Sequence, residues 1–322
     1  MLIIKMKSET LNSIMIRIKD LIKKYPIFLI LIGLLIVGYF SNPMFISLRN
    51  QKNILLDFSV PFILSIGQTM VMLTGGIDLS IGSIVSLMGV ILVIILPKTG
   101  VILSIIFVLL IGMSIGAING ILISRFKILP FIVTLSAMII WQGVAFIITG
   151  SVPVPITIPS FFKINYGYLF GIIPLPVIYS VIIFILSVIL LNYHVIGRRF
   201  YQLGNDEETA KLAGIKVNSL KIGVYALNGF IAAFCGIVVA SRIKLGAPTA
   251  GESFLFDSIA AACLGGTSLM GGQGGVIGTL GGMLLMLNLK NLLILNDVSI
   301  YIQNVIKGFI ILISVIALRK VK

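Results

Sequence analysis

Charged residues are scarce in this 322-residue sequence, and acidic residues are the scarcer of the two signs. Only 11% of the residues are charged, 58% are hydrophobic, and the mean hydropathy is +1.17. Soluble domains carry about a quarter charged residues, so the composition excludes an ordinary soluble domain. Because lipid offers the backbone no hydrogen-bonding partners, the apolar segments must be helices. The sequence therefore predicts an all-α polytopic membrane protein.

Residues that commonly carry catalysis or bind metals are also few, with one histidine and two cysteines in the chain. Cys235 and Cys263 lie in apolar segments without metal-ligand spacing, and we interpret them as small buried residues. His194 and Trp141 lie near segment ends, where polar-tipped rings commonly sit. An intramembrane enzyme needs a convergent nucleophile, base or metal set. We therefore predict no catalytic residue and no metal site, and expect that the chain is not an enzyme.

Ten segments are candidates for membrane spans, since about 20 apolar residues in a helix cross the ~30 Å hydrocarbon core. The first, eighth and ninth are short, and the last two of these flank a glycine-rich stretch. We expect those two to be broken helices packed inside protein, where irregular backbone is tolerated. Together the segments form one predicted transmembrane domain, residues 27–318: Ile27–Phe40, Ile54–Thr74, Leu79–Leu96, Val101–Ile123, Ile128–Thr149, Ile172–Leu191, Leu220–Ala240, Phe254–Leu264, Val276–Leu289 and Ser299–Leu318.

The basic residues are distributed unevenly between the two sides of this predicted domain. With ten spans and a cytoplasmic N-terminus, sixteen of the 24 Lys and Arg residues face inward, seven face outward and Lys307 lies within the last span. Cytoplasmic loops of membrane proteins carry such an excess. Membrane topology therefore explains the net charge of +14 without a nucleic-acid partner. Both termini are expected in the cytoplasm, with residues 1–26 forming a basic amphipathic arm on the lipid surface and residues 319–322 a short tail.

A polar loop, residues 194–219, contains the longest charge-mixed stretch after the arm, Gly197–Lys216. Asn205 or Asp206 can cap a short helix over Asp206–Ala213 by accepting bonds from free backbone N–H groups. Glu207 and Glu208 then fall in the first turn, where negative charge is favourable, and Gly214 follows the helix as a left-handed residue. Its apolar side, which includes Ala210 and Leu212, can contact either a partner protein or the chain's own inner surface.

Three acids and one base lie in or beside the apolar segments. Asp57 and Asp257 each lie about one turn inside an outward-facing end, where a carboxylate reaches the headgroups. Asp78 lies among residues that can cap the third span, and we interpret it as that N-cap rather than as a proton relay. Lys307 can pair with one of the acids or extend toward the membrane surface, and the sequence leaves both open.

Glycines cluster in Thr74–Gly82 and in Leu264–Gly282. In a membrane, glycine permits close helix approach or a sharp break. The second cluster has no lysine and neither follows a strand, so neither is a phosphate-binding loop. The sequences of the two clusters are weakly similar, and a direct repeat or a shared glycine-rich composition would explain this equally well.

Three motifs, in order, resemble the permease subunit of ribose-type carbohydrate ABC importers. Leu73–Ser83 (LTGGIDLSIGS) resembles that family's segment between its second and third spans. Gly197–Ile215 resembles its ATPase-contacting cytoplasmic loop. Pro248–Thr279, which contains DSIAA at Asp257–Ala261 and LGGTSL at Leu264–Leu269, resembles its most distinctive stretch.

The resemblance implies a type II importer-like permease of the bacterial plasma (inner) membrane that takes up ribose or a similar monosaccharide. Implied partners are a separate ATPase subunit, which would bind the ATP, an extracytoplasmic sugar-binding protein and a second permease copy in a homodimer or paired heterodimer. This chain itself has no Walker-type motif and is predicted to bind no cofactor. An alternative is a secondary transporter driven by an ion gradient, which should show paired acids near the midplane.

The candidate functional residues fall into three groups. The ATPase-coupling residues are Gly197, Arg198, Gly204, Asn205, Asp206, Glu207, Glu208, Ala210, Lys211 and Gly214. Polar residues of the apolar segments are candidates for the translocation pathway, with helix–helix hydrogen bonding as the alternative role: Gln68, Thr69, Asn119, Gln142 and Asn228. The glycine segments supply the predicted structural or gating residues Gly75, Gly76, Asp78, Gly82, Gly265, Gly266, Thr267, Gly271 and Gly272.

Overall fold

The computed structural model describes residues 26–319, and nearly all of the predicted arm and tail lie outside the described residues. The chain is helical throughout its apolar segments, as the composition predicts. The long or apolar helices are α2 (Ile27–Ser41), α3 (Leu48–Leu73), α4 (Ile81–Ser124), α5 (Pro130–Thr149), α7 (Leu175–Tyr193), α10 (Val217–Ile243), α11 (Glu252–Leu264), α12 (Val276–Leu295) and α13 (Ile300–Arg319). Six of these are long and apolar enough to cross a membrane by themselves.

Helix α4 contains two of the predicted segments. Its 44 residues are interrupted at Gly100, whose φ of 74° is not helical, three residues after Pro97. Proline cannot continue the hydrogen-bond ladder and glycine adopts positive φ without strain, so the pair turns the chain sharply. Each predicted segment therefore lies in a helix. Of the two expected broken helices, α11 has only 13 residues, but α12 has 20 and is longer than predicted.

Two helices occupy the centre of the bundle. In the most apolar 18-residue window of each helix, 83% of the residues of α3 and 72% of those of α10 are buried. The corresponding share is only 22–28% in α4, α5 and α7. Gly112, Gly116 and Gly120 of α4 lie one turn apart and face α10, where a Cβ on Gly116 would be 2.1 Å from the Tyr225 carbonyl oxygen. Small residues at this spacing let helix backbones approach closely. Backbone contact between α4 and α10 therefore forms much of the core.

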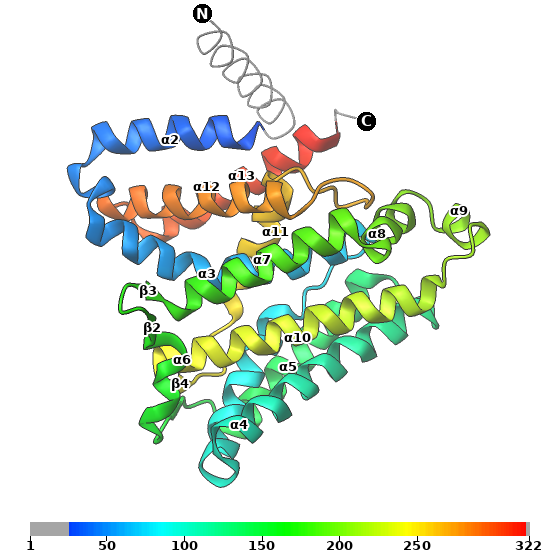
Figure 1. Cartoon of the computed structure of the whole chain (residues 1–322), viewed down its shortest axis with the longest axis horizontal. Coiled ribbons are helices and arrows are strands. Elements are labelled where there is room, and N and C mark those ends of the chain that lie inside the picture. Colours follow the sequence, from blue (N-terminus) through cyan, green and yellow to red (C-terminus); the bar gives the residue numbers. More distant parts are fainter. Residues whose placement is uncertain (1–25, 320–322) are drawn as a thin grey trace, which may run out of the picture.

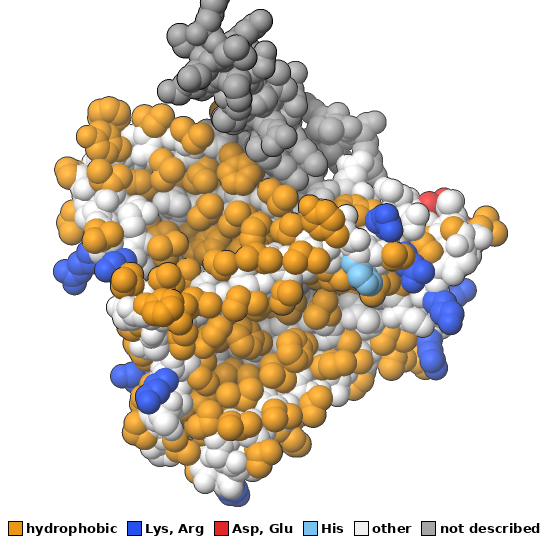
Figure 2. Space-filling view, viewed as in Figure 1, with side chains coloured by type: hydrophobic (Ala, Val, Ile, Leu, Met, Phe, Trp, Pro, Cys, Tyr) orange, Lys and Arg blue, Asp and Glu red, His pale blue; other side chains and the backbone are white. Residues whose placement is uncertain are grey.

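The two ends of the bundle differ in structure (Figure 1). One end carries α8 (Val195–Asn205) and α9 (Glu207–Leu212). The other carries short elements: η1 (Pro43–Ile46), η2 (Pro159–Phe162), α6 (Lys163–Tyr166), and two antiparallel pairs in which β1 (Val154–Pro155) joins β4 (Leu245–Gly246) and β2 (Tyr168–Leu169) joins β3 (Ile173–Pro174). These small strands were not expected from the sequence. Hydrophobic side chains cover the middle of the visible surface, while Lys and Arg lie toward the two ends (Figure 2).

Candidate coupling site

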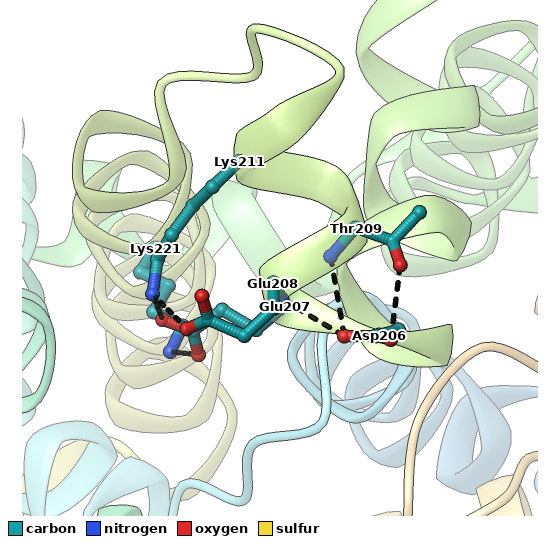
Figure 3. Close-up of polar contacts among 6 residues, drawn as sticks. All are labelled: Asp206, Glu207, Glu208, Thr209, Lys211 and Lys221. Carbon is teal, nitrogen blue, oxygen red and sulfur yellow. Dashed lines mark hydrogen bonds and ion pairs between the residues drawn. The ribbon is translucent and has the colours of Figure 1, made fainter.

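The polar loop folds into two helices rather than one, since α8 precedes the predicted short helix α9. Asp206 caps α9, as predicted: its Oδ1 accepts from the backbone N–H of Glu208 at 2.8 Å and of Thr209 at 3.3 Å (Figure 3). The bonds from Thr209 and Glu208 hold the pKa of Asp206 below its ordinary value. Gly214 has a φ of +78° just beyond the helix, as expected of a left-handed C-terminal residue. The sequence therefore specifies both ends of α9.

Ion pairs connect α9 to the transmembrane bundle. Glu207 contacts Lys211 at 3.1 Å within α9 and Lys221 of α10 at 2.6 Å (Figure 3). Lys211 also contacts Glu208 at 2.8 Å. Partial burial raises the pKa of Glu207, but the bonds from Lys221 and Lys211 outweigh it, and the net pKa lies below the ordinary value. Glu207 is thus a carboxylate at neutral pH that joins α9 to α10.

The apolar side of α9 faces in two directions. Ala210 is 2% exposed and packs in a small cluster with Leu203 and Val217 of the same chain. Leu212 is 89% exposed. Ala210 therefore contacts the chain's own surface, which is one of the two alternatives that the sequence left open. Leu212 is instead the apolar residue that α9 presents outward, and Arg198 of α8 is also exposed.

Backbone atoms of three distant segments meet beside α9, in a contact that we name the glycine junction: Gly75, Gly204, Gly271 and Gly272. The Gly272 N–H donates to the carbonyl oxygen of Leu73 at 3.0 Å. A Cβ on Gly204 would lie 2.0 Å from that same oxygen, and one on Gly271 would lie 2.8 Å from the Gly75 nitrogen. Both predicted glycine clusters therefore touch the end of α8, directly before the cap of α9.

Neighbouring residues strengthen this contact. Asn205 lies against Gly272, where a Cβ would be 2.0 Å from its Oδ1. Tyr201 of α8 donates its hydroxyl to the Gly274 carbonyl at 3.1 Å. Gly197 packs on the backbone of Leu191 at the start of α8. The α8–α9 unit is thus attached to α7, to the end of α3 and to the 265–275 loop.

The other predicted glycine-segment residues lie away from the junction. Gly76 packs on Tyr225 and Gly82 packs on Gly251, the residue before α11. Gly265 packs on Gly278, which brings α11 against α12. Gly266 has a φ of +86° and turns the chain after α11, and Thr267 is fully buried. The glycines of the two clusters therefore allow close packing or chain turns at several separate places, and only some of them contact α8.

Asp78 is not the N-cap of α4, contrary to the prediction. Ser80 occupies the cap position without a side-chain cap bond, and Asp78 lies two residues earlier, fully buried. Its Oδ1 accepts from the Ser80 N–H at 2.9 Å and the Ser80 hydroxyl at 2.6 Å, and its Oδ2 accepts from Asn228 Nδ2 at 2.9 Å. Asn119 donates to the same Ser80 hydroxyl at 3.0 Å. Asp78 therefore joins the 74–80 segment to α4 and α10.

Four of the five pathway candidates lie in the packed interior. Asn119 and Asn228 form the bonds described above. The Thr69 hydroxyl lies 2.7 Å from the hydroxyl of Thr279 in α12. The Gln68 amide lies against the Asp78 backbone; in the amide orientation that satisfies both groups, its nitrogen donates to the Asp78 carbonyl at 3.2 Å and its oxygen accepts from the Asp78 N–H at 3.3 Å. These bonds match the alternative role, hydrogen bonding between segments.

Gln142 differs from the other four because it lines a pocket. The pocket has a volume of about 720 Å³ and lies between α4, α5 and α11, with Gly82, Glu252 and Phe256 also in its wall. Gln142 Nε2 donates to the Pro248 carbonyl at 2.5 Å.

Asp57 and Asp257, the two acids expected near outward-facing ends, each pair with a base. Asp57 of α3 pairs with Arg242 at the end of α10. Asp257 of α11 pairs with Lys307 of α13 at 2.5 Å. The structure thus selects the partner of Lys307 that the sequence left open. Since charge inside a membrane is costly unless paired, each pair also connects two helices.

Comparison with known proteins gives a consistent result. The family model described as "branched-chain amino acid transport system / permease component" matches residues 50–315. The ribose import permease protein of Haemophilus influenzae is 39% identical, over 97% of this chain and 97% of its own length. That of Bacillus subtilis is 39% identical over 98% and 99%, and the L-arabinose transport permease of Escherichia coli is 33% identical over 85% and 84%. No solved structure matches the chain.

Proposed function

We propose that this chain, which belongs to the family of transport-system permease components, forms the translocation pathway of an ATP-driven importer for ribose or a similar monosaccharide. The chain is a membrane transport subunit and not an enzyme. The observation that carries the choice of substrate is the 39% identity to ribose import permeases over nearly the whole of both chains. The permease resemblance seen in the three sequence motifs is confirmed by the same relatives. The chain is accordingly a multi-pass protein of the bacterial plasma membrane.

We place α8 and α9 in the cytoplasm, with both termini on the same side and ten spans between them. The basic excess at Arg198, Arg199, Lys211, Lys216 and Lys221 supports this orientation. The helices at all ten predicted segments support the count, if the two halves of α4 cross separately and the short α11 is completed by the loop that follows it.

The partners of this permease are a separate ATPase inside, which binds the ATP, a sugar-binding protein outside and a second permease copy. The ATPase contacts α9 through Leu212 and the exposed polar face beside it. Movement of α9 reaches the bundle by two routes: the Glu207–Lys221 ion pair to α10, and the glycine junction to α3 and the 265–275 loop. Because these routes are short and tightly packed, α9 and the bundle move together as the ATPases close, and the two permeases rotate about their interface.

A secondary transporter driven by an ion gradient is the competing function. Such a transporter should show acids paired with one another near the midplane. Here Asp57 and Asp257 each form an ion pair with a basic side chain. Asp78 accepts hydrogen bonds from Ser80 and Asn228. The α8–α9 unit also has no role in that mechanism.

Substitution of Leu212 tests the proposal directly. Leu212→Asp puts a charge into the ATPase contact while leaving Ala210 and the Asp206 cap in place. We expect loss of ATPase co-purification and of ribose uptake by at least tenfold, since a buried unpaired charge at an interface costs about 2–5 kcal/mol. Leu212→Met is the matched control and should retain both.

Two outcomes would contradict the proposal. Ribose uptake in Leu212→Asp at the wild-type rate, with the ATPase retained, would remove α9 from the coupling mechanism. Uptake by the wild-type chain that needs an ion gradient and no ATPase would favour the secondary transporter.

A further inference from the structure

A polar cleft lies between α11 and α13 on this otherwise apolar chain. Its volume is about 580 Å³, and its lining includes Glu252, Ser253 and Phe256 of α11 with Asn304 and Lys307 of α13. A smaller pocket of about 210 Å³ shares Ser253, Asn304 and Lys307 and extends the cleft toward α12. We name the combined volume the α11–α13 cleft.

The composition of the cleft requires that it face water or protein rather than lipid. Polar side chains within membrane helices almost always face the bundle interior or a water-filled cavity, because contact with hydrocarbon is costly. Glu252, Ser253 and Asn304 are all exposed on the single chain. One residue further along α13, Val305 is 57% exposed and provides an ordinary lipid-facing side chain. The two faces of α13 thus have different surroundings.

The charged residues of the cleft lining balance, with Glu252 and Asp257 against Lys290 and Lys307, so the lining does not select a charged ligand. Lys307 and Asp257 are 2.5 Å apart and neutralise each other. The hydroxyl of Ser253 and the amide of Asn304 can each donate and accept, as sugar hydroxyls also do. Phe256 is 60% exposed and offers a flat apolar surface to the C–H face of a sugar ring. Small-molecule sites combine an apolar wall with a few placed polar groups in about 300–1,000 Å³, and the cleft has this character.

We infer that the α11–α13 cleft is the surface on which the permease contacts its sugar, with Ser253 and Asn304 bonding to hydroxyls and Phe256 lying against the ring; this inference rests on the proposed import function. Asp257 is a positioning residue, since it holds Lys307 against α11. The contacts are few and weak, and the sugar therefore passes without being retained. Gln142 lines the neighbouring pocket between α4, α5 and α11, and Glu252 and Phe256 belong to the walls of both.

Water access to the cleft is tested by cysteine labelling. In the full complex carrying Cys235→Ala and Cys263→Ala, single cysteines replace Asn304 or Val305 and are exposed to a membrane-impermeant methanethiosulfonate reagent. Only a hydrated thiol ionises and reacts, so we expect Asn304→Cys to react about tenfold faster or more than Val305→Cys. Equal rates, or faster reaction at Val305, would overturn the inference.

Sugar contact is tested by uptake of labelled ribose with the ATPase and the binding protein present. Each lost hydrogen bond should reduce uptake roughly three- to tenfold in Ser253→Ala and Asn304→Leu, while Val305→Leu should leave it unchanged. Equal amounts of variant in the membrane and equal ATPase co-purification separate a contact role from a folding defect. Wild-type uptake in both cleft variants would overturn this inference alone. Absence of ribose uptake and of ATPase binding in the wild-type complex would instead refute the proposed function.

Discussion

At the glycine junction backbone atoms meet backbone atoms, whereas in the α11–α13 cleft side chains line an open volume. A single added methyl group at Gly204 would lie 2.0 Å from the Leu73 carbonyl oxygen, so the junction has no spare space. The larger pocket of the cleft holds about 580 Å³ and is lined by Ser253 and Asn304. Close-packed interiors transmit displacement because they cannot be compressed. A volume lined by polar side chains can instead admit a solute. Under the proposed function, the chain thus transmits movement at one place and contacts the sugar at another.

The largest expected effect concerns Asp78, which joins the segment beyond the junction to α10. Asp78→Leu leaves the Ser80 hydroxyl and the Asn228 amide buried without an acceptor, and should cost on the order of 3 kcal/mol of stability. Asp78→Asn should cost much less, because Asn228 can rotate its amide to present an Oδ1 that has no hydrogen-bond partner among the described residues. Thermal unfolding in detergent with ribose uptake measures both. If the asparagine variant is stable but inactive, the carboxylate charge itself is required.

An intermediate effect is expected at Gly204, where the comparison predicts intolerance of any side chain. Alanine in a helix is normally favoured over glycine by about 1 kcal/mol. At Gly204 the clash with Leu73 reverses the sign, and overpacking should cost about 1–3 kcal/mol, with a matching loss of ATPase-driven uptake.

Gly223 of α10 is the matched control, because a Cβ there meets nothing within 4 Å. Gly223→Ala should be neutral or stabilising in the same unfolding measurement. Equal tolerance at Gly204 and Gly223 would show that the junction is not close-packed.

The smallest effect is expected at the Glu207–Lys221 pair. Glu207 is 41% exposed, and exposed ion pairs contribute about 0.2–1 kcal/mol. Lys221→Met should therefore weaken ATPase association less than about fivefold. A double-mutant cycle with Glu207→Gln isolates the pair. Because the pKa of Glu207 lies below its ordinary value, Glu207 stays charged at any pH above that ordinary value. The coupling energy between Glu207 and Lys221 should therefore stay constant between about pH 6 and 8. A coupling far above this range would make the pair, and not the junction, the main connection to the bundle.

Features that depend on neighbouring residues were predictable from the sequence. The ten apolar segments are all helical, and the cap at Asp206 and the left-handed Gly214 bound α9 as expected. Capping involves groups two or three residues apart, so the local sequence determines it. Membrane helices likewise follow from the need to satisfy every backbone group within the segment.

Features that depend on distant segments were not predictable. Gly75, Gly204 and Gly271 meet through backbone atoms. Because glycine has no side chain, the sequence gives no indication of which residues these glycines contact. Asp78 was interpreted as a local cap because it lies among residues that can cap the third span, while its partner in α10, Asn228, is 150 residues away. Ala210 seemed available for docking because its burial depends on Val217 and Leu203 beyond both ends of α9.

The long separation between Asp78 and Asn228 also has a consequence for biosynthesis. A bacterial ribosome adds about 5–20 residues per second, so Asn228 leaves it roughly 8–30 s after Asp78. Throughout that interval the carboxylate has Ser80 beside it, but not the donor that completes its site. The site around Asp78 is therefore complete only after α10, which carries Asn228, has been synthesised. The contact that joins the 74–80 segment to α10 thus forms late, although its acid is made early in the chain.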